Sequence, residues 1–243
     1  TDVEATAAMA AILLHDVGHG PFSHVMEHTL VDGITHEEIS LMMMERIRDE
    51  GNEEVMDLAI RIFRDEYEKR FLHQLISSQL DVDRLDYLCR DSFFCGVTEG
   101  SVASARILKM MNVKDGKLVV ESKGIYSVEK FLVARRLMYW QVYLHHTSVA
   151  AEQLLIKILE RAKELAAKGI ELFCSPALRY FLYNKITAEV FTQSDKALVQ
   201  YAIAYYLEQA DTYTKEACAA YVTAQTNKAT GVEKTLLQNH PEV

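Results

Sequence analysis

The chain has 243 residues, of which 49% are hydrophobic and 25% are charged, a composition typical of soluble globular proteins. This length can bury a substantial core as one large domain or as a domain with an appendage, and no stretch approaches the roughly 18 apolar residues that a membrane span requires. The formal net charge of -9 argues against strong nucleic-acid binding, which depends on many Lys and Arg contacts to phosphates.

The spacing of the cysteines and the sequence of the first residues bear on the cellular compartment of the protein. Four cysteines are scattered without C-x-x-C spacing, so we expect no disulfide framework and a reducing cytoplasm. The sequence starts at Thr1 without a basic or apolar leader, so we expect no secretory signal and a natural N-terminus further upstream.

Long tracts with apolar residues at three- and four-residue spacing predict a nearly all-α protein. Residues 3–14 form an Ala-rich pattern, which predicts a buried helix. A helix is expected again over residues 22–30, after a bend imposed by Gly18, Gly20 and Pro21.

Capping signals place the next helices. Thr35 as N-cap and Glu38 three residues later form a capping box, so a helix should begin at His36. Further helices are expected from about residue 53 and over residues 69–88, followed by a loop at residues 95–100.

The second half predicts one hairpin and one long helix. Residues 112–120 carry the only convincing strand signal, with Asp115-Gly116 as the turn of a short β-hairpin. One apolar stripe over residues 127–167 predicts a single long helix, straight or bent, that stops at Gly169. We therefore expect an all-α helical bundle with one short β-hairpin, divided into a domain of residues 1–170 and a helical extension of residues 171–243.

The run HDVGHGPFSH suggests metal chemistry. Adjacent imidazole and carboxylate groups, His15 and Asp16, can hold one divalent cation. His19 and His24 follow on the bent segment, which should direct several rings towards one pocket.

A second acidic cluster lies in LDVDRLDYLCRD. On a helix, Asp83, Tyr87 and either Arg90 or Asp91 share one side, with Arg84 at its rim. One carboxylate could therefore meet a metal while its neighbours meet a phosphate and a sugar. Asp81 is the nearest alternative to Asp83.

These motifs, together with T-H-E-E between them, resemble the HD-superfamily deoxynucleoside triphosphate triphosphohydrolases over about residues 1–165. The resemblance implies an HD-domain fold and hydrolysis of a deoxynucleoside triphosphate (dNTP) to the deoxynucleoside and inorganic triphosphate. It also implies one divalent cation, held by His15, Asp16, Asp83 and an upstream histidine that this sequence does not contain. Mn, Mg, Fe, Ni and Zn all suit these ligands. Members commonly form dimers or tetramers, so a homo-oligomer is expected.

The same resemblance gives roles to other residues. It makes His24 a proton donor or water-orienting group, with Glu27 behind it, and gives His19 and His36 contacts to phosphate. Substrate-binding positions follow on the later motifs: Arg84 at the phosphates, Tyr87 and Asp91 at the sugar, and Arg135, Tyr143 and His145 on the long helix. Tyr139 stands where relatives often have histidine.

Structural explanations remain open for several of these residues. His15 and Asp16 could close a helix end, His19 and His36 could cap local backbone, and Glu27 could be a first-turn acid favoured by the helix dipole. The alternative functions are a phosphomonoesterase, a cyclic-nucleotide phosphodiesterase, or a regulatory module that binds nucleotide without turnover. The remaining histidines match no motif and are expected to serve packing or to face solvent: His28, His73, His146 and His240.

Overall fold

The computed structural model describes residues 1–20, 22, 24–51 and 53–193. This part of the chain is mostly helical with one antiparallel hairpin, which confirms the predicted fold class. Helices and strands follow in the order α1 (Asp2–Leu14), α2 (His24–Thr29), β1 (Val31–Asp32), α3 (His36–Glu50), α4 (Glu53–Phe63), α5 (Arg70–Ile76), α6 (Val82–Cys95), α7 (Ser104–Met110), β2 (Met111–Lys114), β3 (Lys117–Val120), α8 (Ile125–Met138), α9 (His146–Ala167), α10 (Pro176–Tyr183), β4 (Ile186–Thr187) and α11 (Ala188–Gln193). The predictions for residues 194–243 lie outside the described residues.

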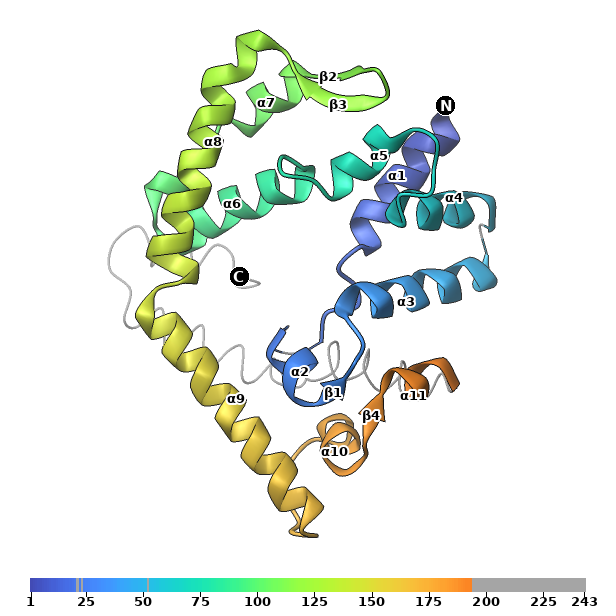
Figure 1. Ribbon diagram of the computed structural model, residues 1–243, viewed down its shortest axis with the longest axis vertical. Helices are drawn as coiled ribbons and strands as arrows, with labels where there is room; N and C mark the ends of the chain where they lie inside the picture. Colours follow the sequence, from blue (N-terminus) through green and yellow to red (C-terminus); the bar gives the residue numbers. More distant parts are fainter. Residues whose placement is uncertain (21, 23, 52, 194–243) are drawn as a thin grey trace, which may run out of the picture.

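Helix α1 starts at a capping box between Thr1 and Glu4 and buries Ala7 and Ala11. Small side chains allow it to pack closely against α4, which lies beside it (Figure 1). The helix ends at Leu14 with His15 as its C-cap, so the His15-Asp16 doublet sits where the chain leaves α1. The other residues of α1 are exposed or half-buried, so the prediction of a buried helix is wrong.

Helix α3 begins as predicted at the Thr35–Glu38 capping box. The Thr35 hydroxyl accepts from the Glu38 backbone N–H, and the Glu38 carboxylate accepts from the Thr35 N–H at 2.8 Å. The segment after α1 is held against this helix, because the Gly18 N–H donates to the buried Ser40 hydroxyl at 2.8 Å. A Cβ at Gly18 would overlap the His36 carbonyl and the Ser40 N–H, so only glycine permits this approach.

The prediction of one helix over residues 69–88 is wrong. The chain forms α5 and α6 instead, because the Asp81 carboxylate accepts from the Arg84 N–H at 2.7 Å and from the Ser78 N–H at 2.9 Å. These bonds make Asp81 the N-cap of a new helix.

The single long helix over residues 127–167 is also wrong. Helix α8 passes into a π-helical segment, Tyr139–Tyr143, and α9 begins only after His145, whose backbone is extended and whose ring accepts from the Thr147 N–H at 3.3 Å. Figure 1 shows α8 and α9 pointing in different directions from this break. The stop at Gly169 is confirmed by its positive φ of 76°.

The hairpin β2–β3 has the predicted turn, with Asp115 and Gly116 at φ 51° and 73° between the paired Lys114 and Lys117. A second pairing was not predicted: β1 and β4 are parallel, with Val31 opposite Ile186. Two residues per strand are too few to produce an alternating pattern in the sequence.

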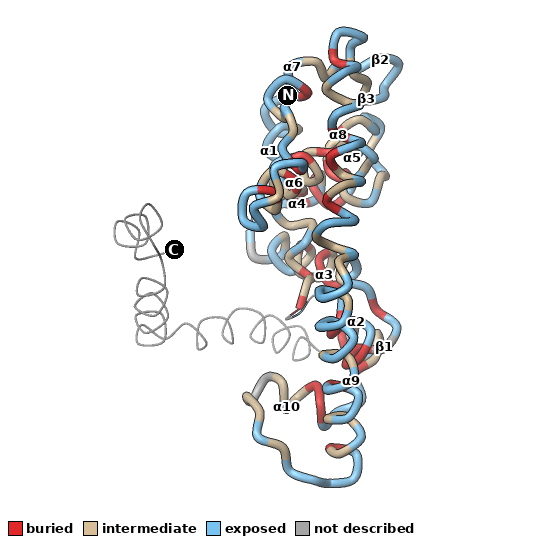
Figure 2. The backbone as a smooth tube through the Cα atoms, turned by 90° about the vertical axis from the view of Figure 1, so that its left-hand side faces the viewer, coloured by how far each residue is buried: buried red, intermediate tan, exposed pale blue. Residues whose placement is uncertain are grey.

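Buried side chains form three clusters, and Figure 2 shows buried segments in both the upper and the lower half of the molecule. One cluster joins α1, α4 and α5, and another joins α6, α7 and α8. The third contains Leu30 and Ile39 together with Phe181 and Ile186, so the described part of the C-terminal extension packs on the stretch from α2 to α3. The division near residue 170 stays a prediction. No helix in the described residues is long and apolar enough to cross a membrane.

Candidate functional site

The structure brings His15, Asp16 and Asp83 together. Each offers one ligand atom, and these atoms all lie within 4.8 Å of one another. His15 Nε2 is 3.3 Å from Asp16 Oδ1 and 3.9 Å from Asp83 Oδ1. The end of α1 and the first turn of α6 therefore meet at these three side chains.

The state of the His15 ring suits metal binding. Its Nδ1 lies 2.7 Å from the Ile12 carbonyl oxygen, which can only accept, so Nδ1 carries a proton. In the neutral ring this leaves the lone pair on Nε2, the atom that faces the two carboxylates. Such an outer hydrogen bond is typical of metal-ligating histidines.

The negative charges of Asp16 and Asp83 lie close together, and the protein only partly neutralises them. Burial raises the pKa of Asp83, and the charges of Asp16 and Asp81 add to this effect, while His15 opposes it. A divalent cation would relieve both the burial cost and the repulsion, so the residues present fit such an ion.

Asp81 and Asp83 have different surroundings although two residues apart. Asp81 is 2% exposed, and its oxygens accept from backbone N–H groups and from Arg84 Nε at 3.1 Å. Asp83 is half-buried and faces His15. The geometry thus distinguishes the two aspartates that the sequence left as alternatives.

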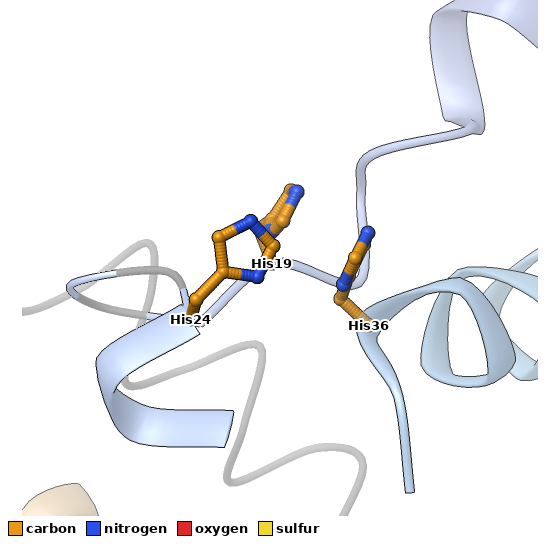
Figure 3. A group of neighbouring side chains, drawn as sticks. All are labelled: His19, His24 and His36. Carbon is orange, nitrogen blue, oxygen red and sulfur yellow. The ribbon is translucent and has the colours of Figure 1, made fainter. Parts of the chain in front are cut away.

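A second group lies next to the first. His19, His24 and His36 come from the segment after α1 and from the first residues of α2 and α3, and their rings lie beside one another (Figure 3). The rings of His19 and His36 stack with centroids 3.9 Å apart. Burial lowers the pKa of His19, and the nearby His36 lowers it further.

Glu27 holds two of these rings. Its Oε2 accepts from His36 Nδ1 at 2.9 Å and lies 3.5 Å from His24 Nδ1. Burial by itself raises the pKa of Glu27, but the hydrogen bond and charge of His36 outweigh it and keep the pKa below its ordinary value. The sequence reading placed Glu27 behind His24, whereas its shorter contact is to His36.

The predicted sugar residues, Tyr87 and Asp91, both contact Tyr143. The Tyr143 hydroxyl donates to Asp91 Oδ2 at 2.6 Å, and the Tyr87 ring packs edge-on against the Tyr143 ring. Burial and the hydrogen bond to Asp91 raise the pKa of Tyr143 far above its ordinary value, so this hydroxyl keeps its proton.

The basic residues are anchored by neighbouring polar groups. Arg84 Nε donates to the Ser78 carbonyl at 2.8 Å as well as to Asp81. Arg135 donates to the Gln79 side chain at 3.2 Å, and its guanidinium lies over the Tyr139 ring. His145 serves as the N-cap of α9, and its predicted substrate contact stays a prediction.

A cavity of about 230 Å³ opens beside the three candidate metal ligands and Arg84. His73 and Glu37 line it too, although His73 matches no motif and Glu37, within T-H-E-E, was given no role in the site. His73 Nδ1 donates to the Ile62 carbonyl at 3.0 Å, which fixes the ring. Their place becomes visible only when α3 and α5 are packed in three dimensions.

Comparison with known proteins assigns this geometry to a family. Residues 2–91, which include both groups of histidines and Asp83, match the HD domain, and residues 102–218 match the HD associated region. Residues 2–91 are therefore an HD domain. The HD domain thus carries the His15, Asp16 and Asp83 cluster.

Relatives share much of this chain. A crystal structure of a phosphohydrolase from Bacteroides thetaiotaomicron VPI-5482 is 56% identical with a TM-score of 0.81, covering 98% of this chain and 57% of that one. The uncharacterized protein YwfO of Bacillus subtilis (strain 168) is 33% identical, covering 92% of this chain and 53% of that protein. A deoxynucleoside triphosphate triphosphohydrolase SAMHD1 homolog of Dictyostelium discoideum is 27% identical over 68% of this chain and 35% of its own length. The chain spans about half the length of the first two relatives.

Proposed function

We propose that this HD domain hydrolyses a dNTP to the deoxynucleoside and inorganic triphosphate with the help of one divalent cation. The observation that carries the proposal is the convergence of His15, Asp16 and Asp83 within 4.8 Å at a cavity that Arg84 also lines. The likeness to the Dictyostelium protein named a deoxynucleoside triphosphate triphosphohydrolase supports this substrate class.

His15, Asp16 and Asp83 would hold the cation. When bound, the ion supplies Lewis-acid polarisation of a phosphoryl oxygen. The carboxylates of Asp16 and Asp83 give the site the negative charge that a divalent ion requires, and the Ile12 carbonyl keeps the His15 lone pair on Nε2.

The histidine group would serve the phosphate and the leaving oxygen. Water attacks the α-phosphorus, the bond to the 5′-oxygen breaks, and that oxygen takes up a proton. His24 is exposed with Nδ1 towards Glu27, so it could deliver this proton or orient the water. His19 and His36 would donate to phosphate oxygens.

The other predicted residues would position the nucleotide. We assign the phosphates to Arg84 and Arg135, because a guanidinium matches phosphate oxygens well. Asp91 would accept from the sugar 3′-hydroxyl while Tyr143 donates to its other side, and Tyr87 would pack on the sugar. His145 would contribute from the end of the same segment. A cytoplasmic homodimer or tetramer remains our expectation for the assembly.

The test is a product assay. The protein is incubated with each dNTP and Mn²⁺ or Mg²⁺, and released triphosphate is measured. Asp83→Asn should abolish release, while the exposed Asp57→Asn should leave it unchanged as a matched control. Orthophosphate from monoesters, or opening of a cyclic nucleotide, would replace the proposed reaction with one of its two enzymatic alternatives. Nucleotide-induced assembly without any product would favour the regulatory module.

A further inference from the structure

We propose that His19, His24 and His36 form a second cation site, suited to zinc or a similar transition ion, next to the His15, Asp16 and Asp83 site. Each of the three offers a ring nitrogen, and the three nitrogens lie within 4.8 Å of one another. They come from three segments that the fold brings together, which Figure 3 shows. Three imidazole ligands with one open position form a known type of zinc site.

The neighbouring carboxylate orients two of the rings. Because Glu27 accepts from His36 Nδ1 at 2.9 Å and faces His24 Nδ1 at 3.5 Å, the ring nitrogen left for a metal is Nε2 in both. A carboxylate behind a ligating imidazole fixes the ring and strengthens its lone pair. His24 and His36 therefore supply ligand atoms, and Glu27 fixes the orientation of both rings.

The packing of the rings already holds two of the ligands together. His19 and His36 stack with centroids 3.9 Å apart and an interplanar angle of 13°. A tetrahedral ion about 2.0–2.1 Å from each nitrogen requires the ligand atoms to lie roughly 3.4 Å apart. The side chain of His24 is 57% exposed, so it can turn inwards to complete the set.

One carboxylate oxygen connects the two candidate sites. Asp16 Oδ1 lies 3.3 Å from His15 Nε2 and 3.7 Å from His19 Nε2. The two sites nevertheless differ in chemistry. The first has one nitrogen and two carboxylate ligands, which suit Mg²⁺ or Mn²⁺, whereas the second has three nitrogens, which suit Zn²⁺, Co²⁺ or Ni²⁺.

A regulatory consequence rests on the proposed function. If His24 transfers a proton during dNTP hydrolysis, an ion that takes its lone pair removes that proton carrier. Excess Zn²⁺ should then inhibit an enzyme that works with Mg²⁺ or Mn²⁺. The site itself does not depend on this reaction, because metal binding is measured without substrate.

The experiment counts ions. Chelator-treated protein is equilibrated with Zn²⁺, dialysed and analysed for metal by mass spectrometry, and Co²⁺ is added in parallel to read the visible spectrum of a nitrogen-rich site. We expect two Zn²⁺ per chain in the wild type and one in each of Asp83→Asn, His24→Ala and His36→Ala. The Co²⁺ spectrum should persist in Asp83→Asn and disappear in the two histidine variants.

Two further variants make the result specific. His146→Ala removes an exposed histidine on α9 and should leave two ions. Glu27→Gln should lower the affinity for the second Zn²⁺ by about 10–100-fold, as expected for a residue that hydrogen-bonds to the metal ligands. Because His24 is exposed, its variant should remain folded, which circular dichroism checks. One Zn²⁺ in the wild type that Asp83→Asn abolishes would overturn the proposal. So would loss of the second ion in His28→Ala but not in His36→Ala, since this would move the site to His24, Glu27 and His28.

Discussion

Replacing Asp81 with alanine should destabilise the protein far more than replacing Asp83. The Asp81 carboxylate accepts from the Arg84 N–H at 2.7 Å, the Ser78 N–H at 2.9 Å and Arg84 Nε at 3.1 Å, and the residue is 2% exposed. Loss of an N-cap costs about 1 kcal/mol, and leaving a buried N–H without a partner costs about 1–3 kcal/mol. Since the bonds share one acceptor, their costs are not simply additive, and we expect a loss of about 3 kcal/mol.

Asp83→Ala should have almost no effect on the stability of the protein when metal is absent. Burial and neighbouring carboxylates raise the pKa of Asp83, so its charged form is less favourable in the folded protein than in the unfolded chain. Removing this carboxylate should change the free energy of unfolding by less than about 0.5 kcal/mol, as for sites outside the main stabilising contacts. With metal present, Asp83→Ala should lose the ion.

Guanidinium unfolding in chelator, followed by circular dichroism, measures both variants. About 3 kcal/mol corresponds to a melting temperature roughly 6–12 °C lower for a chain of this size. Asp81→Asn, which keeps one side-chain oxygen, should fall between Asp81→Ala and the wild type. Asp81→Ala removes the cap and leaves backbone N–H groups without their acceptor. A loss of stability below about 1 kcal/mol would therefore refute the assignment of Asp81 as a structural cap. An equal loss for Asp83→Ala would refute it too.

Three other perturbations test the site. Gly18→Ala should destabilise the protein by about 2 kcal/mol or more through overpacking, because the new Cβ meets the His36 carbonyl and Ser40. Thermal melting checks this, and an unchanged melting temperature would contradict the close approach. Tyr143→Phe removes the donor to Asp91 and should lower kcat/KM about tenfold through loss of a charge-assisted hydrogen bond. Because the pKa of Tyr143 is raised, its hydroxyl stays protonated, and the wild type should lose no activity through ionisation of this group up to about pH 10. A loss of activity below that pH that is absent in Tyr143→Phe would contradict this prediction. Chelation should lower the free energy of unfolding by about 2.7 kcal/mol relative to protein with free Mg²⁺ at about 100 times its Kd, and Asp83→Asn, which lacks a ligand of the site suited to Mg²⁺, should show no such change.

Local signals in the sequence were sufficient for several elements. The Thr35–Glu38 capping box and the Asp115-Gly116 turn each involve atoms within a few residues, so their chemistry is readable without the fold. The break between α5 and α6 is local as well, since Asp81 caps a helix three residues before Arg84. The apolar spacing continued across it and concealed the cap. At His145 the extended backbone and the π-helical segment before it end the helix that periodicity predicted.

The candidate site was predictable only in part for the same reason. Motif spacing suggested that Asp83, Tyr87 and Asp91 share a helix face, but the bond from Tyr143 to Asp91 joins α6 to the π-helical segment across 52 positions. The link from Glu27 to His36 crosses between α2 and α3. His73 faces the cavity only because α5 packs near α1. No periodicity encodes contacts of this kind.

The arrangement of the ligands determines which mutations can separate the two candidate cation sites. His15, Asp16, His19 and His24 all lie between the end of α1 and the first residue of α2, and the Gly18 backbone within this segment closely approaches α3. A change there moves ligands of both sites at once. Only Asp83 on α6 and His36 on α3 belong to one site each and lie outside the segment. Mutations in α6 or α3 should therefore abolish cation binding at one site and not at the other, whereas mutations at Gly18 should impair binding at both sites.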